Sequence, residues 1–356
     1  MPMLLLDRYL TREIAKPLVI FCGGLLLLFA NFTAVRYLNR VADGIMPFQS
    51  VLPLVLVRAA VALELLLPIA LHLSVVVTLG RLYTDSEMTA LFSSGVSPSR
   101  IIRIVFAGSL IVAGIVAFLS IYVRPWANEN RYRLERQAAA DVDLNDMQPG
   151  HFYENSSGTV LFFQRRAQSS GRMREVFIQY RSEDRVRLIW AEEAHYPEAV
   201  EAGASRTLVC SGAQIYELSR DRGAVRQATS DELVLEWEKA QVLSEEYRRK
   251  AAPTWQLAHS VLPKDIAEFQ WRLSTPVAAL LMGLLGFPLS RARARQGKYA
   301  KLFVSVLCYA TFYNLTMMAK TWVEKGVVSA VPGIWWVHLL LAILVASLLW
   351  RRTTHP

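Results

Sequence analysis

The chain has 356 residues, of which 53% are hydrophobic, and its formal net charge is +9. Residues 124–268 hold 20 basic and 23 acidic side chains, so the positive excess lies entirely in the apolar remainder of the chain. Membrane topology explains such an excess, which argues against a nucleic-acid-binding protein. The three cysteines, Cys22, Cys210 and Cys308, are too few and too scattered for a disulfide framework.

Six apolar segments are each close to the ~20 residues that a helix needs to cross a bilayer core. They cover residues 17–35, 59–79, 104–123, 273–290, 302–319 and 334–350. Because a backbone in hydrocarbon must satisfy its own hydrogen bonds, each segment is predicted to be a membrane-spanning helix. The chain is therefore expected to have an N-terminal membrane half (1–123), an insert (124–268) and a C-terminal membrane half (269–356).

The distribution of Lys and Arg predicts the orientation of these helices. With the N-terminus inside, the inner loops hold Arg8, Arg12, Lys16, Arg81, Arg100, Arg103, Arg291, Arg293, Arg295, Lys298, Lys301, Arg351 and Arg352. The short outer loops hold only Arg36, Arg40 and Lys325. This positive-inside bias places both termini in the cytoplasm and the insert outside.

The segment before the first span has one apolar face. Its apolar residues Met3, Leu6, Leu10 and Ile14 recur at helical spacing, opposite Asp7, Arg8 and Arg12. Two structures fit this pattern equally well: a helix lying on the inner membrane surface, or a packed extension of the first span.

The insert is predicted to be an all-β domain. Short segments rich in Val, Ile, Leu and aromatic residues cover 159–164, 175–180, 185–194, 206–210, 213–218 and 232–237. Turn residues separate them at 156–158, 169–171, 211–212 and 222–223. This spacing is typical of a sandwich or jelly roll. Such a domain either has an ordinary filled core, or binds an apolar chain between its sheets, or stacks edge to edge with similar domains.

Residues 84–87, Thr-Asp-Ser-Glu, match the capping-box pattern, so a short cytoplasmic helix is expected to begin at Thr84 and to end near Gly95. Ser97 and Pro98 are expected to cap and open the next helix. The apolar face of the short helix consists of Met88, Leu91 and Phe92. That face either fits a groove on a soluble partner, or packs on the lipid surface while Glu87 only caps the helix.

Catalytic and metal-binding patterns are absent from the sequence, including a phosphate-binding glycine loop, HExxH and GxSxG. Charged residues inside or beside the spans remain to be explained: Arg58, Glu64, Arg272 and Lys320. Each costs roughly 2.5 to 3.5 kcal/mol at mid-membrane, so it should face protein or water. Arg272 and Lys320 lie near span ends and are expected to reach the interface. Arg36 and Lys320, at outer helix ends, could pair with an anion at the outer leaflet.

Several of these motifs resemble the LptF/LptG (YjgP/YjgQ) permease family of the lipopolysaccharide exporter. The resemblance rests on residues 79–88 (LGRLYTDSEM) with Gly95, on 268–272 (EFQWR), on 288–290 (PLS) and on 295–297 (RQG), together with the six-span layout. Within the family, residues 36–47, 79–86 and 157–162 are more similar to the LptF branch than to LptG.

The resemblance implies a fold, a location and partners. The fold is a six-helix membrane protein of the inner membrane of a Gram-negative bacterium, with a periplasmic jelly-roll-like domain between helices 3 and 4. The chain would be a non-catalytic subunit without a cofactor or metal. Its implied partners are an LptB-type ATPase dimer, a paralogous LptG-type permease, an LptC-type periplasmic jelly-roll protein and lipopolysaccharide.

The resemblance also implies roles for single residues. Glu87 would contact the ATPase, and Tyr83, Met88 and Leu91 would lie in the same groove. Arg36 and Lys320 would hold the phosphates of lipopolysaccharide. Thr33 stands where the family often has a lysine, and Arg58 and Glu64 match no family position. The alternatives are a mechanotransmission permease that moves no lipid itself, a membrane-anchored enzyme and a purely structural bridge.

Overall fold

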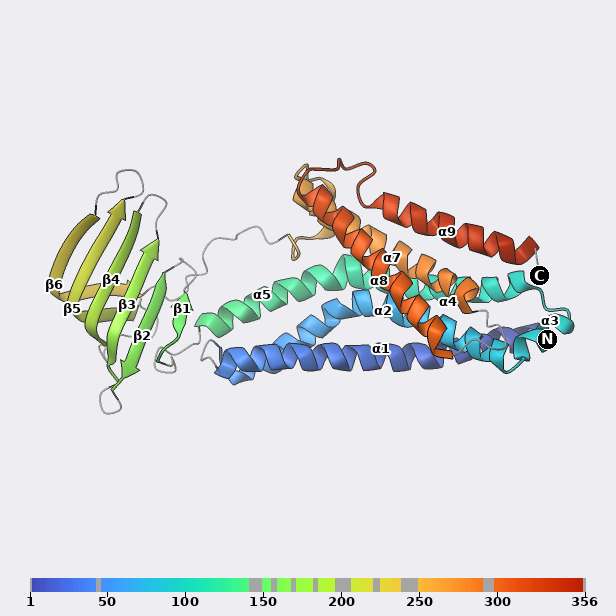
Figure 1. Cartoon of the computed structure of the whole chain (residues 1–356), viewed down its shortest axis with the longest axis horizontal. Coiled ribbons are helices and arrows are strands. Elements are labelled where there is room, and N and C mark those ends of the chain that lie inside the picture. Colours follow the sequence, from blue (N-terminus) through green and yellow to red (C-terminus); the bar gives the residue numbers. More distant parts are fainter. Residues whose placement is uncertain are drawn as a thin grey trace. The chain divides into compact units, whose positions relative to one another are not determined.

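The computed structural model describes the chain except for residues 1, 43–45, 141–148, 155–158, 168–170, 182–184, 196–205, 220–224, 238–248, 291–297 and 355–356. The chain divides into two compact units, and each is described by itself. The helical unit comprises Met1–Thr33, Val55–Arg131 and Tyr247–Pro356. The sheet unit comprises Ala34–Leu54 and Tyr132–Glu246 (Figure 1).

Several predicted features lie outside the described residues. They are the turns at 156–158, 169–170 and 222–223, the pairs 43–44 and 296–297, and the inner-loop cations Arg291, Arg293 and Arg295. The side chains of Met3, Lys298, Lys301, Arg351 and Arg352 are likewise not described. The positive-inside argument therefore stays a prediction for that part of the chain.

The predicted membrane segments are helical. The long helices are α1 (Pro2–Ala42), α2 (Val51–Thr84), α4 (Pro98–Phe118), α7 (Pro263–Ser290), α8 (Lys298–Glu324) and α9 (Trp335–Thr354). A short 3-10 turn, η1 (Phe48–Ser50), precedes α2, and a π turn, η2 (Leu119–Val123), joins α4 to α5 (Arg124–Ala140). Among the described residues, five helices are long and apolar enough to cross a membrane, and the apolar part of α9, Trp335–Trp350, is shorter. The count of six spans stays a prediction.

Helix α7 contacts α4, α8 and α9 (Figure 1). Gly283 and Gly286 allow the close approach of α7 to its neighbours. A Cβ at Gly283 would overlap the Ser109 hydroxyl of α4, and one at Gly286 would lie 2.8 Å from the Val75 Cβ of α2. Small residues at such positions let membrane helices pack tightly, because lipid supplies no hydrophobic force between them.

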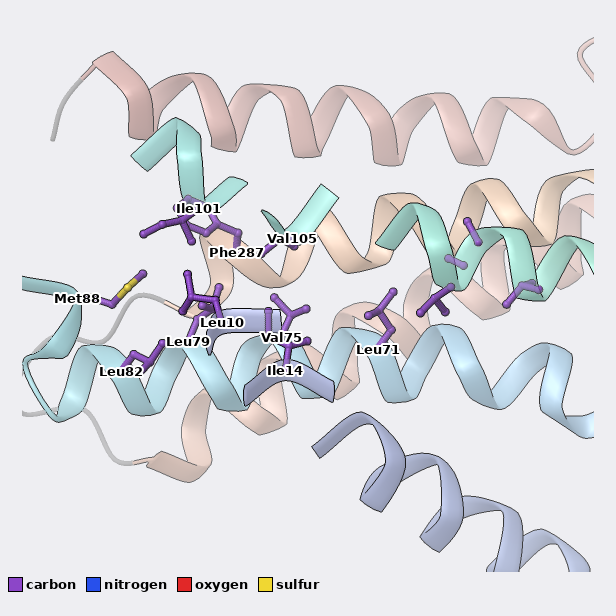
Figure 2. Packing of buried hydrophobic residues seen from close by; sticks show 14 residues of the cluster. Leu10, Ile14, Leu71, Val75, Leu79, Leu82, Met88, Ile101, Val105 and Phe287 are labelled. Atoms are coloured by element: carbon purple, nitrogen blue, oxygen red, sulfur yellow. The ribbon is translucent and has the colours of Figure 1, made fainter. Parts of the chain in front are cut away.

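The start of α1 is a packed helix rather than one that lies apart on the membrane surface. Leu10 has no exposed surface and Ile14 is 9% exposed. Both belong to an apolar cluster with residues of α2, α4, α7 and the short helix α3 (Glu87–Ser93), as Figure 2 shows. The structure therefore favours the second of the two interpretations of this segment, a packed extension of the first span.

The sheet unit contains one antiparallel sheet of six strands in chain order (Figure 1). The strands are β1 (Phe152–Glu154), β2 (Val160–Arg166), β3 (Met173–Arg181), β4 (Arg185–His195), β5 (Arg206–Ser219) and β6 (Val225–Trp237). A sandwich or jelly roll requires two packed sheets. The described strands instead form a meander, because each strand pairs with the next along the chain. The prediction of β structure is confirmed, but its arrangement differs from the expected one.

One expected turn in the sheet is absent. Residues 206–210 and 213–218 were predicted as two strands separated by Ser211 and Gly212, but they form the single strand β5. Gly212 takes φ +62° inside that strand, while Ser211 and Ala213 keep the same register with β6. The absence of a Cβ allows this conformation without a reversal of the chain. Strand β1 was not predicted.

One face of the sheet is buried. Its core contains Leu161, Phe163, Val176, Ile178 and Cys210, each without exposed surface. Burial raises the pKa of the Cys210 thiol to about 11. Since the thiolate is the reactive form of cysteine, Cys210 should be chemically inert at neutral pH.

The helical unit also contains α3, α6 (Thr254–Ala258) and the first part of α5, up to Arg131. Helix α5 continues the third span for 17 residues beyond Val123, where the sequence placed the start of the β insert. The chain that returns from the sheet unit reaches α7 through α6.

Candidate functional site

Helix α3 exists, but it does not begin as the capping box predicted. Thr84 is the last residue of α2, and its hydroxyl donates to the Gly80 carbonyl at 2.9 Å instead of accepting an amide of the next helix. Within a helical turn, this bond to the carbonyl four residues earlier competes with capping. Ser86 takes the cap position of α3 with φ 63°, and no side-chain cap hydrogen bond forms. The result is a sharp break between α2 and α3.

The end of α3 is as predicted. Gly95 has φ +86°, the left-handed conformation that glycine adopts at lowest cost. The Val96 amide donates to the Leu91 carbonyl at 3.1 Å, and the Gly95 amide donates to the Phe92 carbonyl at 3.0 Å. These two bonds form a Schellman motif. Pro98 opens α4 at its first turn, as expected.

The apolar side of α3 packs into its own chain. Met88 has no exposed surface and lies in the same cluster as Leu82 of α2 and Ile101 of α4 (Figure 2). Tyr83 and Leu91 are partly buried against this cluster. A seven-residue helix needs tertiary packing to persist, and Met88 anchors α3 to the rest of the chain. The contact of Met88 with the groove of a partner, which the resemblance implied, stays a prediction.

The polar side of α3 is open to solvent. The exposed residues on and beside the helix are Asp85, Ser86, Thr89, Ala90, Ser93 and Ser94. Glu87 lies between the two sides and is partly exposed. Among the described residues, its carboxylate has one hydrogen bond, donated by the Tyr9 hydroxyl to Oε2 at 2.9 Å, and no ion pair is formed with it. The Arg81 guanidinium acts on Glu87 electrostatically at longer range, so the carboxylate has a cation in its surroundings but forms no ion pair with it.

A second candidate site is an ion cluster buried inside the helical unit. Arg124 donates to Glu268 Oε1 at 2.8 Å and to Glu64 Oε2 at 2.9 Å. Lys320 donates to Glu268 Oε2 at 2.9 Å, and its ammonium lies 4.9 Å from the centre of the Trp271 ring. The cluster joins α2, α5, α7 and α8, which is a costly arrangement in an apolar region unless each charge is paired.

Arg272 does not reach the membrane interface as predicted. It is fully buried, 3.5 Å from Glu268, and donates to the segment that returns from the sheet unit. Its acceptors are the carbonyls of Arg249, Lys250 and Ala252 and the hydroxyl of Thr254, at 2.9 to 3.3 Å. The side chain stays inside because these acceptors and Glu268 replace the water that it would find at the interface.

The two predicted lipid-binding residues have different environments. Lys320 is 8% exposed, within the ion cluster. Arg36 is exposed on the part of α1 that belongs to the sheet unit. The two residues lie in different units of the chain. The other unexplained cation of the spans, Arg58, is partly buried on α2.

Sequence reasoning missed Arg124, Glu268 and Tyr9 as members of these sites. Arg124 and Glu268 are 144 positions apart, and neither has a sequence signal that names its partner. The one sequence signal for Glu268 was its place in the segment 268–272 (EFQWR), one of the motifs on which the family resemblance rests. Within the described residues, no group of three or more His, Cys, Asp or Glu side chains is placed to hold a metal ion.

Comparison with known proteins identifies the family of this chain. Residues 8–351 match the family "Lipopolysaccharide export system permease LptF/LptG". The chain is similar to the lipopolysaccharide export system permease protein LptF of Escherichia coli K12, with 25% identity over 361 residues that cover 98% of this chain and 95% of the relative. The LptF proteins of E. coli O157:H7 and Shigella flexneri match to the same extent. The chain therefore belongs to the LptF/LptG family of lipopolysaccharide export permeases.

Proposed function

We propose that this permease is an LptF-type subunit that is driven from the cytoplasmic side through α3. In this proposal α3 lies against an LptB-type ATPase, and Glu87 meets a cation of that partner. The observation that supports it is the state of Glu87, whose carboxylate forms no ion pair within the described part of the chain. Burying such a carboxylate in an interface is unfavourable unless a cation or several donors meet it.

The packing of α3 suggests how motion passes into the membrane helices. Met88 fixes the helix to α2 and α4, so a displacement of α3 is transmitted through side-chain contacts rather than through a flexible loop. The exposed residues Thr89, Ala90 and Ser93 are small, which lets a partner surface approach the backbone closely. Nucleotide binding shifts the permease between two states only if the ATPase contacts α3 differently in each.

Lipopolysaccharide is proposed to enter between this chain and a paralogous LptG-type permease. Its acyl chains lie along the apolar first and fifth spans, and its phosphates contact Lys320. Arg36, in the other unit, is proposed separately as a phosphate-binding residue. Lys320 would have to leave Glu268 to contact a phosphate. Glu268 then keeps Arg124 at 2.8 Å and Arg272 at 3.5 Å, so its negative charge stays paired.

The sheet is proposed to dock an LptC-type periplasmic protein through an edge. Strand β6 has 13 residues and, among the described strands, pairs only with β5. An edge strand of that length offers unpaired backbone groups to a strand of another domain. The glycolipid would pass along the joined sheets toward the outer membrane.

Reversal of the charge at Glu87 tests the proposed coupling. In the reconstituted exporter, we expect Glu87→Arg to lower the lipopolysaccharide exported per ATP hydrolysed by about tenfold or more, which corresponds to ~1.4 kcal/mol of coupling. Glu129→Arg, which reverses an exposed carboxylate on α5, is the matched control and should export normally. Wild-type export by Glu87→Arg would refute the proposal.

A further inference from the structure

The N-terminal segment of α1 (residues 7–16) contacts every cytoplasmic element of the proposed coupling site. Asp7 pairs with Arg100 of α4 at 3.0 Å, and Glu13 pairs with Arg81 of α2. Tyr9 donates to Glu87 at the start of α3. Three elements that are separated along the chain are thus joined by one segment, through three side chains that lie within about two helical turns.

Pro17 accounts for the way in which this segment attaches to α2. A proline inside a helix has no amide hydrogen, so the carbonyl four residues earlier, that of Glu13, loses its helical donor. The Thr78 hydroxyl of α2 donates to that carbonyl at 3.1 Å, and the Ser74 hydroxyl donates to the next one, that of Ile14. The backbone groups near Pro17 are therefore satisfied by α2.

Apolar packing reinforces these polar bonds. Leu10, with no exposed surface, lies in the cluster that holds Met88 (Figure 2). Leu10 and Tyr9 are adjacent, so the same turn of α1 places one side chain in the cluster that holds Met88 and the other on the Glu87 carboxylate. The position of the Tyr9 hydroxyl is consequently fixed relative to α3 and not only relative to α1.

We infer that Tyr9 is a positioning residue for Glu87. Its hydroxyl holds Oε2, which restricts the rotamers of a long side chain, while Oε1 has no donor among the described residues and remains for the partner's cation. The neutral hydroxyl orients the carboxylate without neutralising it, whereas a Lys or Arg at this position would compete with the partner. This inference rests on the proposed role of Glu87 and extends it to α1.

The experiment compares Tyr9→Phe with wild type in the full exporter reconstituted in proteoliposomes. The substitution removes one hydroxyl and keeps the ring. We expect export per ATP hydrolysed to fall about threefold to tenfold, the effect of one solvent-exposed hydrogen bond that contributes about 0.7 to 1.4 kcal/mol. Tyr122→Phe, at an exposed tyrosine of the helical unit, should match wild type. In the Glu87→Ala background, Tyr9→Phe should cause no further loss of export per ATP hydrolysed, because the carboxylate that the Tyr9 hydroxyl binds is absent.

Three outcomes would overturn the inference, and they are distinguishable. If Tyr9→Phe exports like Tyr122→Phe while Glu87→Ala uncouples the exporter, only the role of Tyr9 fails. If Tyr9→Phe lowers thermal stability or assembly equally in both backgrounds, its role is purely structural. If Glu87→Ala itself leaves coupling unchanged, the proposed function of α3 fails together with the inference.

Discussion

At the scale of single residues, this permease contains five charged side chains that are buried together. Three are cations, Arg124, Arg272 and Lys320, and two are carboxylates, Glu64 and Glu268. Glu268 contacts all three cations, so it is the centre of the cluster. The Glu268 side chain is 1% exposed, so water cannot take its place as the partner of the three cations.

The central place of Glu268 predicts a large effect of neutralising it. Glu268→Gln leaves three buried cations with Glu64 alone, which should destabilise the helical unit by about 3 to 5 kcal/mol. Thermal unfolding of the detergent-purified protein measures this change. The control is Glu324→Gln. The Glu324 carboxylate lies 3.9 Å from the Lys320 ammonium, which also pairs with Glu268, but its side chain is 33% exposed. This control should lower the free energy of unfolding by less than about 1 kcal/mol. Equal thermal unfolding midpoints for Glu268→Gln and Glu324→Gln would contradict the role of Glu268 as the shared partner of the three buried cations.

At the scale of elements, close packing fixes the position of α7. Gly283 faces Ser109 of α4 and Leu71 of α2, and an added Cβ would lie 2.9 Å from the Leu71 Cδ2 and from the Ser109 Cβ. Both distances are shorter than ordinary van der Waals contact. The helices would have to separate to accept even one methyl group.

Gly283→Ala should therefore destabilise the helical unit by about 1 to 3 kcal/mol, although alanine favours helix more than glycine does. Gly114→Ala on α4, where a Cβ would meet nothing within 4 Å, should be neutral or slightly stabilising. Adding Ser109→Gly to Gly283→Ala removes the overlapping side chain and should restore part of the lost stability. A thermal unfolding midpoint of Gly283→Ala equal to that of Gly114→Ala would show that α7 is free to shift.

The elements that sequence predicted well are those with a local physical cause. Five apolar helices, the β character of the insert, the existence of α3 and its stop at Gly95 all follow from residues that are close along the chain. The start of α3 was misplaced because the Thr84 hydroxyl had two possible partners, and it donates to the carbonyl of Gly80 instead of accepting the capping amide. Gly212 suggested a turn, but pairing with two neighbouring strands keeps β5 continuous.

The candidate sites were only partly predictable, for a related reason. Glu87 could be found from its motif, whereas the hydroxyl that holds it comes from Tyr9, 78 positions away. Arg272 and Lys320 were expected at the interface, because a single sequence shows the cost of a buried charge and not its partner. Their shared partner, Glu268, becomes apparent only when α7 and α8 are brought together, and Arg124 of α5 pairs with the same carboxylate.

At the scale of the whole molecule, function depends on which side of the membrane each part faces. Coupling requires α3 in the cytoplasm, and transfer of the glycolipid requires the sheet in the periplasm. The distribution of Lys and Arg predicts this orientation. Of the described cations, Arg81 and Arg100 flank α3, which agrees with a cytoplasmic position for that helix.

Cysteine labelling tests the orientation directly. In a background without Cys22 and Cys308, Phe152→Cys on β1 and Thr89→Cys on α3 introduce thiols at exposed positions. Cys210 can remain, because burial raises the pKa of its thiol to about 11. At pH 8 about 0.1% of such a thiol is ionised, against roughly a quarter of an exposed one, so it reacts more than ~100-fold more slowly.

We expect a membrane-impermeant maleimide to label Phe152→Cys in cells whose outer membrane alone is permeabilised, and to label Thr89→Cys only after the inner membrane is disrupted. The parent background, with Cys210 alone, should stay unlabelled until the protein is denatured. Labelling of Thr89→Cys in cells with an intact inner membrane would place α3 in the periplasm. Glu87 could then not meet a cytoplasmic ATPase, and both the coupling role of α3 and the positioning role of Tyr9 would fail.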